Sequence, residues 1–164
     1  MAQVGRRLLP GAGVMSAPAA HALPRVLIAE DGDEYTERFS RLLGGQFAFE
    51  RVTSFSELLR ALVVPASALI LDLDFRRTPR ELLVDAQGNP AGAADAAELA
   101  EVQGILILRA LRARANPLPA LLCADLDDPE RAAFLCEELR PLQISPSSES
   151  LPAIAARLHQ LTQR

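Results

Sequence analysis

The chain has 164 residues, of which 49% are hydrophobic and 4% aromatic. This length is enough for one domain with a sizeable core, and a net charge of −4 argues against nucleic-acid binding through a basic surface. No apolar run approaches the roughly 20 residues that span a bilayer, so we expect a soluble, cytoplasmic protein without membrane contact.

The N-terminal segment, residues 1–24, is rich in Ala, Gly and Pro, which predicts a disordered leader. Two arginines precede a weakly apolar stretch, as they would in a signal peptide, but Pro10 and Gly13 interrupt that stretch. We therefore expect a leader rather than a secretion signal, with either Met1 or Met15 as the first residue.

The chain after the leader begins with two strand–helix units. Residues 25–31 form a buried strand pattern that ends in acids, and residues 33–43 carry an amphipathic helix pattern. Residues 47–53 alternate weakly, as an edge strand does. A capping box at Ser54 then opens a helix that Pro65 ends. The apolar face of this helix is expected at Leu58, Leu59, Leu62 and Val63.

A third strand and a third helix are separated by a long polar segment. The run ALILDLDF (68–75) places four apolar residues before two aspartates. Residues 76–103 are polar and Ala-rich, which indicates an insertion, and residues 104–115 predict a helix. The pattern over 95–111 favours a backward extension of that helix by two turns or more, and a flexible loop over the site is an equal alternative.

The remaining chain predicts two more strands, at 118–124 and 140–145, and two more helices. One helix covers 130–139 behind the N-cap Asp128. The apolar stripe of the last helix is Leu151, Ile154, Leu158 and Leu161. Five strands thus alternate strictly with five helices over residues 25–162. Because parallel strands are joined by right-handed crossovers, this alternation predicts an α/β fold, a doubly wound (βα)5 three-layer sandwich around a five-stranded parallel sheet.

Acidic residues end two of the predicted strands. Glu30 and Asp31 end the first strand, and Asp72 ends the apolar part of the third. Ligands of such sheets bind at the carboxyl ends of the strands, so three carboxylates converge there if the two strands are neighbours. Unpaired carboxylates raise one another's pKa, and Mg²⁺ relieves the repulsion through oxygen ligands. Singly, such acids are often only solvated strand ends, but three of them favour a phosphoryl-transfer site.

Five motifs, taken in order, resemble the receiver domain of two-component response regulators. They are VLIAEDGDE (26–34), LILD (69–72), GILILRALRA (104–113), PALLCAD (119–125) and LQISP (142–146). Each motif is weak alone, but together they cover residues 25–162. The resemblance implies a flavodoxin-like strand order 2-1-3-4-5. It also implies a role in phosphorelay signal transduction, with a sensor histidine kinase or another signalling protein as partner.

The resemblance further implies the site residues. Asp72 corresponds to the phosphoacceptor, and Glu30, Asp31 and the main-chain carbonyl of Asp74 would join it in holding Mg²⁺. Apart from its own phosphorylation at Asp72, the domain would not be an enzyme. No output domain follows the last predicted helix, so we expect a stand-alone domain that acts through protein–protein contacts.

Three positions depart from the family pattern. Ala124 stands where the family has a Thr or Ser hydroxyl, Ser145 where it has a Lys, and Leu142 where it has an aromatic switch residue. A charge-assisted contact contributes roughly 1.5–3 kcal/mol, so its loss weakens phosphoryl stabilisation by about one to two orders of magnitude. We therefore expect an atypical or degenerate receiver, either with Asp72 as an impaired phosphoacceptor or as an interaction module that works without phosphorylation.

The insertion offers two further roles besides that of a loop. It is a candidate surface for protein contacts, and it is a candidate cover that restricts the access of a kinase to Asp72. In the second case Arg76, Arg77 or Arg80 would supply the missing positive charge at the site.

Two other α/β families remain as alternatives. The motif LDLDF (71–75) resembles haloacid-dehalogenase-type aspartyl phosphatases, in which the first Asp is the nucleophile and the second a general acid. That family needs a Thr or Ser after a later strand and a Lys further on, whereas Ala124 stands at the former place and the chain has no lysine. A nucleotide- or flavin-binding module has less support, because the loop after the first strand is acidic rather than Gly-rich.

Overall fold

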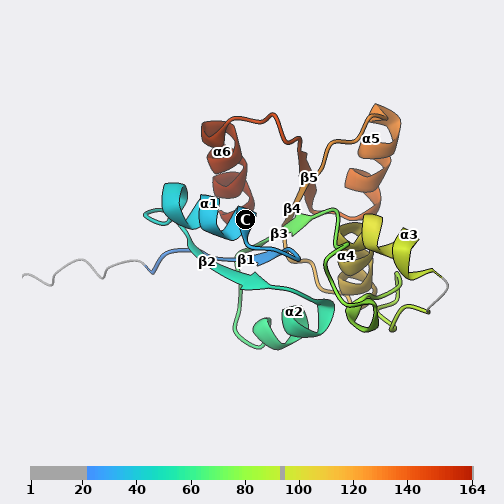
Figure 1. Cartoon of the computed structure of the whole chain (residues 1–164). Helices are drawn as coiled ribbons and strands as arrows, with labels where there is room; N and C mark the ends of the chain where they lie inside the picture. The colour runs from blue at the N-terminus through green and yellow to red at the C-terminus, as the bar shows by residue number, and fades with distance from the viewer. Residues whose placement is uncertain (1–21, 93–94, 164) are drawn as a thin grey trace, which may run out of the picture.

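The computed structural model describes residues 22–92 and 95–163, so the predicted leader lies outside the described residues except for 22–24. Five parallel strands form one sheet in the order β2-β1-β3-β4-β5 (Figure 1). Their bounds are β1 Arg25–Ala29, β2 Ala48–Val52, β3 Ala68–Asp72, β4 Ala120–Cys123 and β5 Leu142–Ser145. This order confirms the predicted doubly wound α/β fold and its flavodoxin-like strand order.

Helices cover both faces of the sheet. Their bounds are α1 Glu34–Leu43, α2 Phe55–Ala61, α3 Ala96–Glu101, α4 Gln103–Ala113, α5 Pro129–Glu138 and α6 Leu151–Thr162, with a 3₁₀ turn η1 at Arg80–Leu82. α1 and α6 pack on one face, and α2, α4 and α5 pack on the other. Figure 1 shows α1 and α6 on the side of the sheet opposite α2. In the described ranges, no helix is both long and apolar enough to cross a membrane.

The central strands are apolar along their whole length because both of their faces are covered. In β3, Leu69 and Leu71 belong to the core shared with α2, α4 and α5, whereas Ala68 and Ile70 belong to the core shared with α1 and α6. All four side chains are fully buried. This two-sided burial explains why the strand is a continuous apolar run rather than an alternating one.

The predicted alternation of five strands with five helices is wrong in one place, because the segment before α4 forms a separate helix, α3. Val102 divides the two helices with a φ of −128°, which lies outside the helical range. The buried Gln103 follows, and its side-chain amide accepts from the Val84 N–H at 3.0 Å and donates to the Val84 carbonyl at 3.1 Å. The predicted backward extension of the helix is therefore present, but it is not continuous with α4.

Most of the predicted element ends differ from the structure by a few residues, and β1 ends at Ala29 rather than at residue 31. Two of the differences have a clear physical reason. β3 ends at Asp72 rather than at residue 75, because the Leu73 carbonyl leaves the sheet and accepts the Gly104 N–H at 3.1 Å. α2 ends at Ala61, so Val63 is 84% exposed and is not part of an apolar helix face.

The described part of the insertion, residues 76–103, is folded against the core. Leu83 and Val84 are buried in the same core as α2 and α4. Val84 forms an isolated antiparallel bridge with Pro90, and Gly88, whose φ is +84°, lies in the turn between them. A glycine suits this turn because other residues rarely adopt a positive φ. The insertion is therefore a packed excursion that begins and ends beside β3.

We expect Gly104→Ala to lower the free energy of unfolding by about 1–3 kcal/mol, the usual cost of overpacking. Gly104 lies in the first turn of α4, where a Cβ would overlap the carbonyl oxygen of Asp72 and lie 3.0 Å from its carbonyl carbon. Gly45→Ala is the control, since a Cβ there meets nothing within 4 Å. Chemical denaturation followed by circular dichroism measures both variants, and equal stabilities would contradict a tight contact between α4 and β3.

Candidate functional site

The predicted acidic residues meet at the carboxyl edge of the sheet. β1 and β3 are neighbours, with Ala29 opposite Leu71, so Glu30 and Asp72 follow at the same edge. Asp31 comes next in the chain, just beyond Glu30. The strand ends therefore converge as expected, but their carboxylates have different partners.

Glu30 caps helix α1. The residue is 1% exposed, and its carboxylate accepts the backbone N–H groups of Tyr35 at 3.0 Å and Thr36 at 2.9 Å together with the Thr36 hydroxyl at 2.5 Å. These N–H groups belong to the first helical turn, which has no intrahelical acceptors for them and favours a negative charge. Both oxygens of Glu30 are therefore directed at the helix.

Asp31 forms an ion pair with Arg77 of the insertion. The Nε and Nη2 of Arg77 donate to Asp31 Oδ1 at 3.1 and 2.9 Å, and the backbone N–H of Arg77 donates to Oδ2 at 2.8 Å. The same guanidinium donates to Glu34 Oε1 at 2.7 Å, and this hydrogen bonding lowers the pKa of Glu34 to about 2. The Asp31 side chain is only 4% exposed, so little of it is open to solvent.

Asp72, the last residue of β3, is half-buried. Its Oδ1 accepts the N–H of Leu73 at 2.8 Å. Burial is the main cause that raises the pKa of Asp72 from its usual 3.8 to about 6, and the negative charges of Asp31 and Asp74 add to this rise. Raised carboxyl pKa values of this kind are frequent at reactive sites.

Asp74 faces the insertion rather than Asp72. Its Oδ1 accepts the N–H of Arg76 at 2.9 Å, and its Oδ2 lies 3.3 Å from Arg76 Nε. Arg76 in turn lies 3.2 Å from a carboxylate oxygen of Glu101 in α3. Within the described ranges, none of the three arginines expected to supply charge at Asp72 forms a hydrogen bond with it.

This arrangement does not fit the predicted magnesium site. In the part of the chain that the structure describes, no three acidic, histidine or cysteine side chains are placed to hold a metal ion together. Both oxygens of Glu30 cap α1, and both oxygens of Asp31 are bound by Arg77. The ligand set of Glu30, Asp31, Asp72 and the main-chain carbonyl of Asp74 therefore stays a prediction, and it would require Arg77 to release Asp31.

The positions expected to bind and sense a phosphoryl group lie at β4 and β5. Ala124 follows β4, and its N–H donates to the Ser145 carbonyl at 3.0 Å. The Ser145 hydroxyl donates to Glu149, whose carboxylate also accepts from Arg157 of α6 at 2.8 and 3.0 Å. Leu142 opens β5 and is buried. The contact of Ser145 with Glu149 is not among the sequence predictions. The signal for it is that the two residues lie close together in the chain, just before α6.

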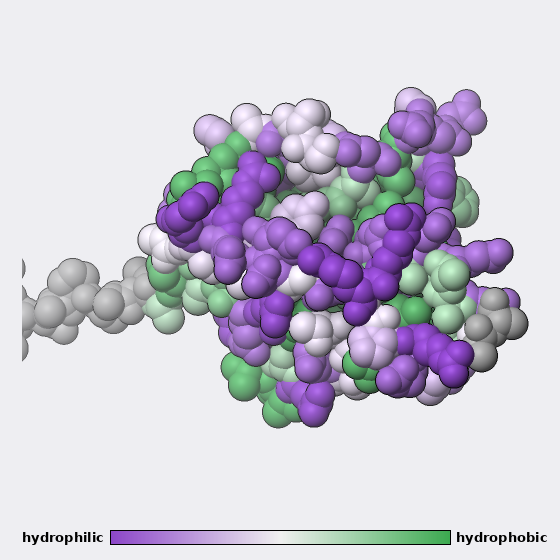
Figure 2. Space-filling view, in the orientation of Figure 1, coloured by the Kyte–Doolittle hydropathy of each residue, from purple (hydrophilic) through white to green (hydrophobic). Residues whose placement is uncertain are grey.

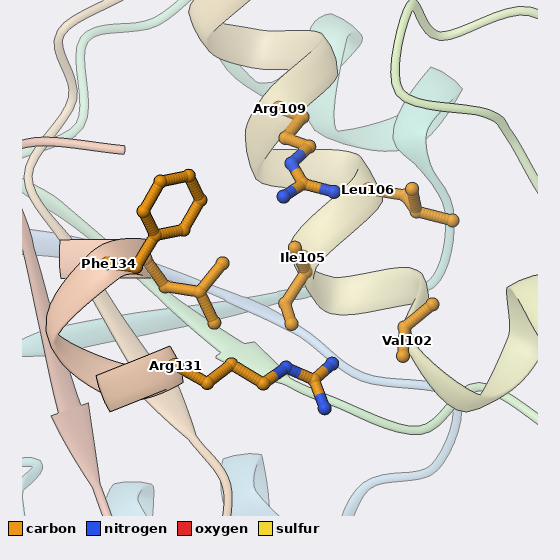
Figure 3. Close-up of a pocket in the computed structure, with 7 residues that line it drawn as sticks. Val102, Ile105, Leu106, Arg109, Arg131 and Phe134 are labelled. Atoms are coloured by element: carbon orange, nitrogen blue, oxygen red, sulfur yellow. The ribbon is translucent and has the colours of Figure 1, made fainter. Parts of the chain in front are cut away.

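An apolar groove lies between α4 and α5, apart from the acidic edge (Figure 3). Val102, Ile105 and Leu106 line one wall, and Arg131 and Phe134 reach into the groove from α5. Phe134 is 63% exposed, which is unusual for a large aromatic side chain. In the view of Figure 2, hydrophilic side chains cover much of the face, and hydrophobic ones show in several places, among them the lower margin near α2 and the upper left near α1 and α6.

No protein-family model matches the chain, and no curated protein matches it in sequence. Solved structures do match its fold. The receiver domain of a Francisella response regulator has a TM-score of 0.62 at 15% identity, over 86% of this chain and 98% of that one. A signal receiver domain of a histidine kinase from Syntrophus aciditrophicus gives 0.58 at 18% identity, over 85% and 90%. A two-component response regulator from Clostridium difficile gives 0.60 at 8%, over 86% and 97%.

The fold is that of a response regulator receiver domain. This result confirms the resemblance carried by the five sequence motifs. Within the receiver fold, the long connection between β3 and α4 is where η1 and α3 lie.

We expect Asp72→Asn to stabilise the protein at pH 7.5 and to leave it unchanged near pH 4. The folded protein holds the Asp72 proton up to about pH 6, whereas the unfolded chain releases it near 3.8. The wild type therefore loses stability as the pH rises between these two values, and the neutral amide does not. The full effect is at most about 3 kcal/mol, and solvent around the half-buried group reduces it to about 1–2 kcal/mol.

Melting temperatures of both proteins between pH 4 and pH 8 measure this difference. Other carboxylates titrate in both proteins and cancel. A difference that does not grow with pH would contradict the burial of a charged Asp72.

Proposed function

We propose that this chain is an atypical receiver domain of phosphorelay signalling that acts in the cytoplasm through protein–protein contacts, with Asp72 as an impaired phosphoacceptor. The observation that carries the proposal is that the acidic half of a phosphoryl-transfer site is present and its hydroxyl and cationic half is not. Carboxylates meet at the carboxyl edge of a receiver fold, whereas the ends of β4 and β5 offer Ala124 and Ser145 in place of a hydroxyl and an ammonium group.

Asp72 has the properties of an acceptor for a phosphoryl group. Its Oδ1 accepts the N–H of Leu73 at 2.8 Å, and within the described residues none of the arginines of the insertion forms a hydrogen bond with it. A pKa of about 6 leaves most of the carboxylate ionised above pH 7. An ionised carboxylate oxygen is able to attack the phosphorus of a phosphodonor and form an acyl phosphate, while the bond from phosphorus to the donor's leaving group breaks.

The cation that would stabilise the transferred phosphoryl group is missing at the end of β5. Ser145 carries no charge, and Arg157, which shares Glu149 with the Ser145 hydroxyl, is bound to that carboxylate. Ala124 cannot donate a hydrogen bond from its side chain. Because one charge-assisted contact contributes roughly 1.5–3 kcal/mol, its loss lowers phosphoryl stabilisation about ten- to a hundredfold.

We infer that the chain acts through a protein surface that contacts a sensor histidine kinase or another signalling protein. The insertion has a defined, packed shape, and Leu82 in η1 is 42% exposed. Phe134, beside the groove between α4 and α5, adds a second exposed apolar side chain. We propose the insertion and the groove beside Phe134 as the two surfaces available for such a contact.

The aspartyl phosphatase alternative has less support. In that mechanism Asp74 would act as a general acid beside Asp72, but its carboxylate is bound to Arg76. The LDLDF motif also lies on the third strand along the chain rather than on the first. We therefore infer no enzymatic activity beyond phosphorylation of Asp72 itself.

Intact-mass analysis after incubation with a small-molecule phosphodonor and Mg²⁺ tests the acceptor. We expect slow, partial addition of a single phosphate to the wild type and none to Asp72→Asn. Rapid, complete addition would contradict the impairment, and addition to the variant or to neither protein would contradict the role of Asp72. Catalytic release of phosphate that depends on Asp74 would favour the phosphatase.

A second experiment restores the missing groups. Ala124→Thr combined with Ser145→Lys should increase the phosphorylated fraction or its lifetime by about tenfold or more, because the ammonium and hydroxyl groups can contact the phosphoryl oxygens. Ala124→Val combined with Ser145→Met is the matched control, since these side chains have similar sizes but lack both groups. Equal phosphorylation of the two double variants would contradict a missing cation as the cause.

A further inference from the structure

We propose that Arg77 is a tethered cation that takes the place of a divalent metal at the acidic edge of the sheet and keeps metal away from Asp31. The inference goes beyond the proposed function and does not depend on it, because it concerns only which positive charge neutralises these carboxylates. It starts from a disagreement: the fold implies a metal site, but the side chains as arranged do not fit one.

One arginine binds two carboxylates through five hydrogen bonds. Arg77 donates three to Asp31, at 2.8, 2.9 and 3.1 Å, and these occupy both oxygens of that carboxylate. Its Nη1 and Nη2 also donate to the two oxygens of Glu34, at 2.7 and 2.9 Å. Such paired, planar contacts suit a guanidinium, whose donors are held in a rigid fork.

The start of the insertion positions Arg77. Phe75 is 0% exposed, and its N–H donates to the Ala100 carbonyl at 2.8 Å. The Thr78 N–H donates to the Phe75 carbonyl at 3.0 Å, which closes a turn that contains Arg77. The turn is thus anchored to α3 at the other end of the insertion, and it carries the arginine to the end of β1.

Gly32 leaves the space that this ion pair needs. A Cβ on Gly32 would overlap Arg77 Nη2 and Glu34 Oε2 and would lie 2.8 Å from Arg77 Cζ. The loop after β1 and the turn after β3 therefore fit each other, with a small residue on one side and the guanidinium on the other.

A divalent cation and Arg77 compete for the same oxygens. Mg²⁺ requires near-octahedral oxygen coordination at short distance, so it reaches Asp31 only if the guanidinium leaves. The Asp31 side chain is 4% exposed while that of Arg77 is 57% exposed, so the arginine covers the carboxylate from the solvent side. Because Arg77 is part of the same chain, its effective concentration at Asp31 is high and does not fall on dilution.

Calorimetric titration of Mg²⁺ and Mn²⁺ into the full chain, without phosphodonor or partner, tests the inference. We expect no saturable binding to the wild type and saturable binding to Arg77→Gln, with an affinity gain of at least about tenfold, or about 1.4 kcal/mol. Arg76→Gln is the matched control. It removes the same charge from the neighbouring residue, but Arg76 pairs with Asp74 and Glu101 rather than with Asp31. This control should behave like the wild type.

The gain should disappear when Asp31→Asn is added to Arg77→Gln, which ties the binding to that carboxylate. A wild-type dissociation constant within about threefold of the Arg77→Gln value would overturn the inference. Such a difference is well short of the tenfold that 1.4 kcal/mol gives. Absence of binding to every variant would overturn it as well. Far-UV circular dichroism checks that each variant is folded. If Arg77→Gln does not fold, Arg77→Lys replaces it, with a smaller gain expected because the charge remains but the fork is lost.

Discussion

Carboxylates at the ends of adjacent parallel strands repel one another, and the carboxyl edge of this sheet is organised around the need to neutralise them. Glu30 is compensated by backbone N–H groups of α1, and Asp31 is compensated by Arg77. Asp72 accepts the adjacent backbone N–H of Leu73 but has no arginine partner among the described residues, and burial raises its pKa. The contacts of Glu30 hold α1 at this edge, and those of Asp31 hold the start of the insertion there. The acidic motif that suggests phosphoryl chemistry is thus also part of what holds α1 and the insertion in place.

The fold could be predicted from the sequence because its inner strands are buried on both faces and its helices are amphipathic. The run ALIL (68–71) is an unambiguous buried strand for this reason. The element ends were less predictable, since they depend on contacts with distant parts of the chain. Leu73 leaves β3 to accept a hydrogen bond from Gly104, and Gln103 interrupts the helix to bind Val84.

The positions of the site residues could be predicted from the sequence, but their hydrogen-bond and ion-pair partners could not. Asp72, Ala124 and Ser145 lie at the strand ends where the motifs placed them. The sequence suggested that an arginine of the insertion would bring charge to Asp72, whereas Arg77 binds Asp31, 46 residues away along the chain. A local motif specifies which residue ends a strand, but the packing of the insertion decides which carboxylate the arginine meets.

The tight joint between α4 and β3 has a mechanical consequence. The Gly104 N–H is bound to the Leu73 carbonyl, and no side chain on Gly104 separates the helix from the carbonyl group of Asp72. Three residues before Gly104, α3 ends at Glu101, the partner of Arg76. Closely packed groups of this kind transmit strain instead of absorbing it. A displacement of the start of α4 would therefore also displace the backbone of Asp72, so the insertion that leads into this helix is in direct mechanical contact with the end of β3.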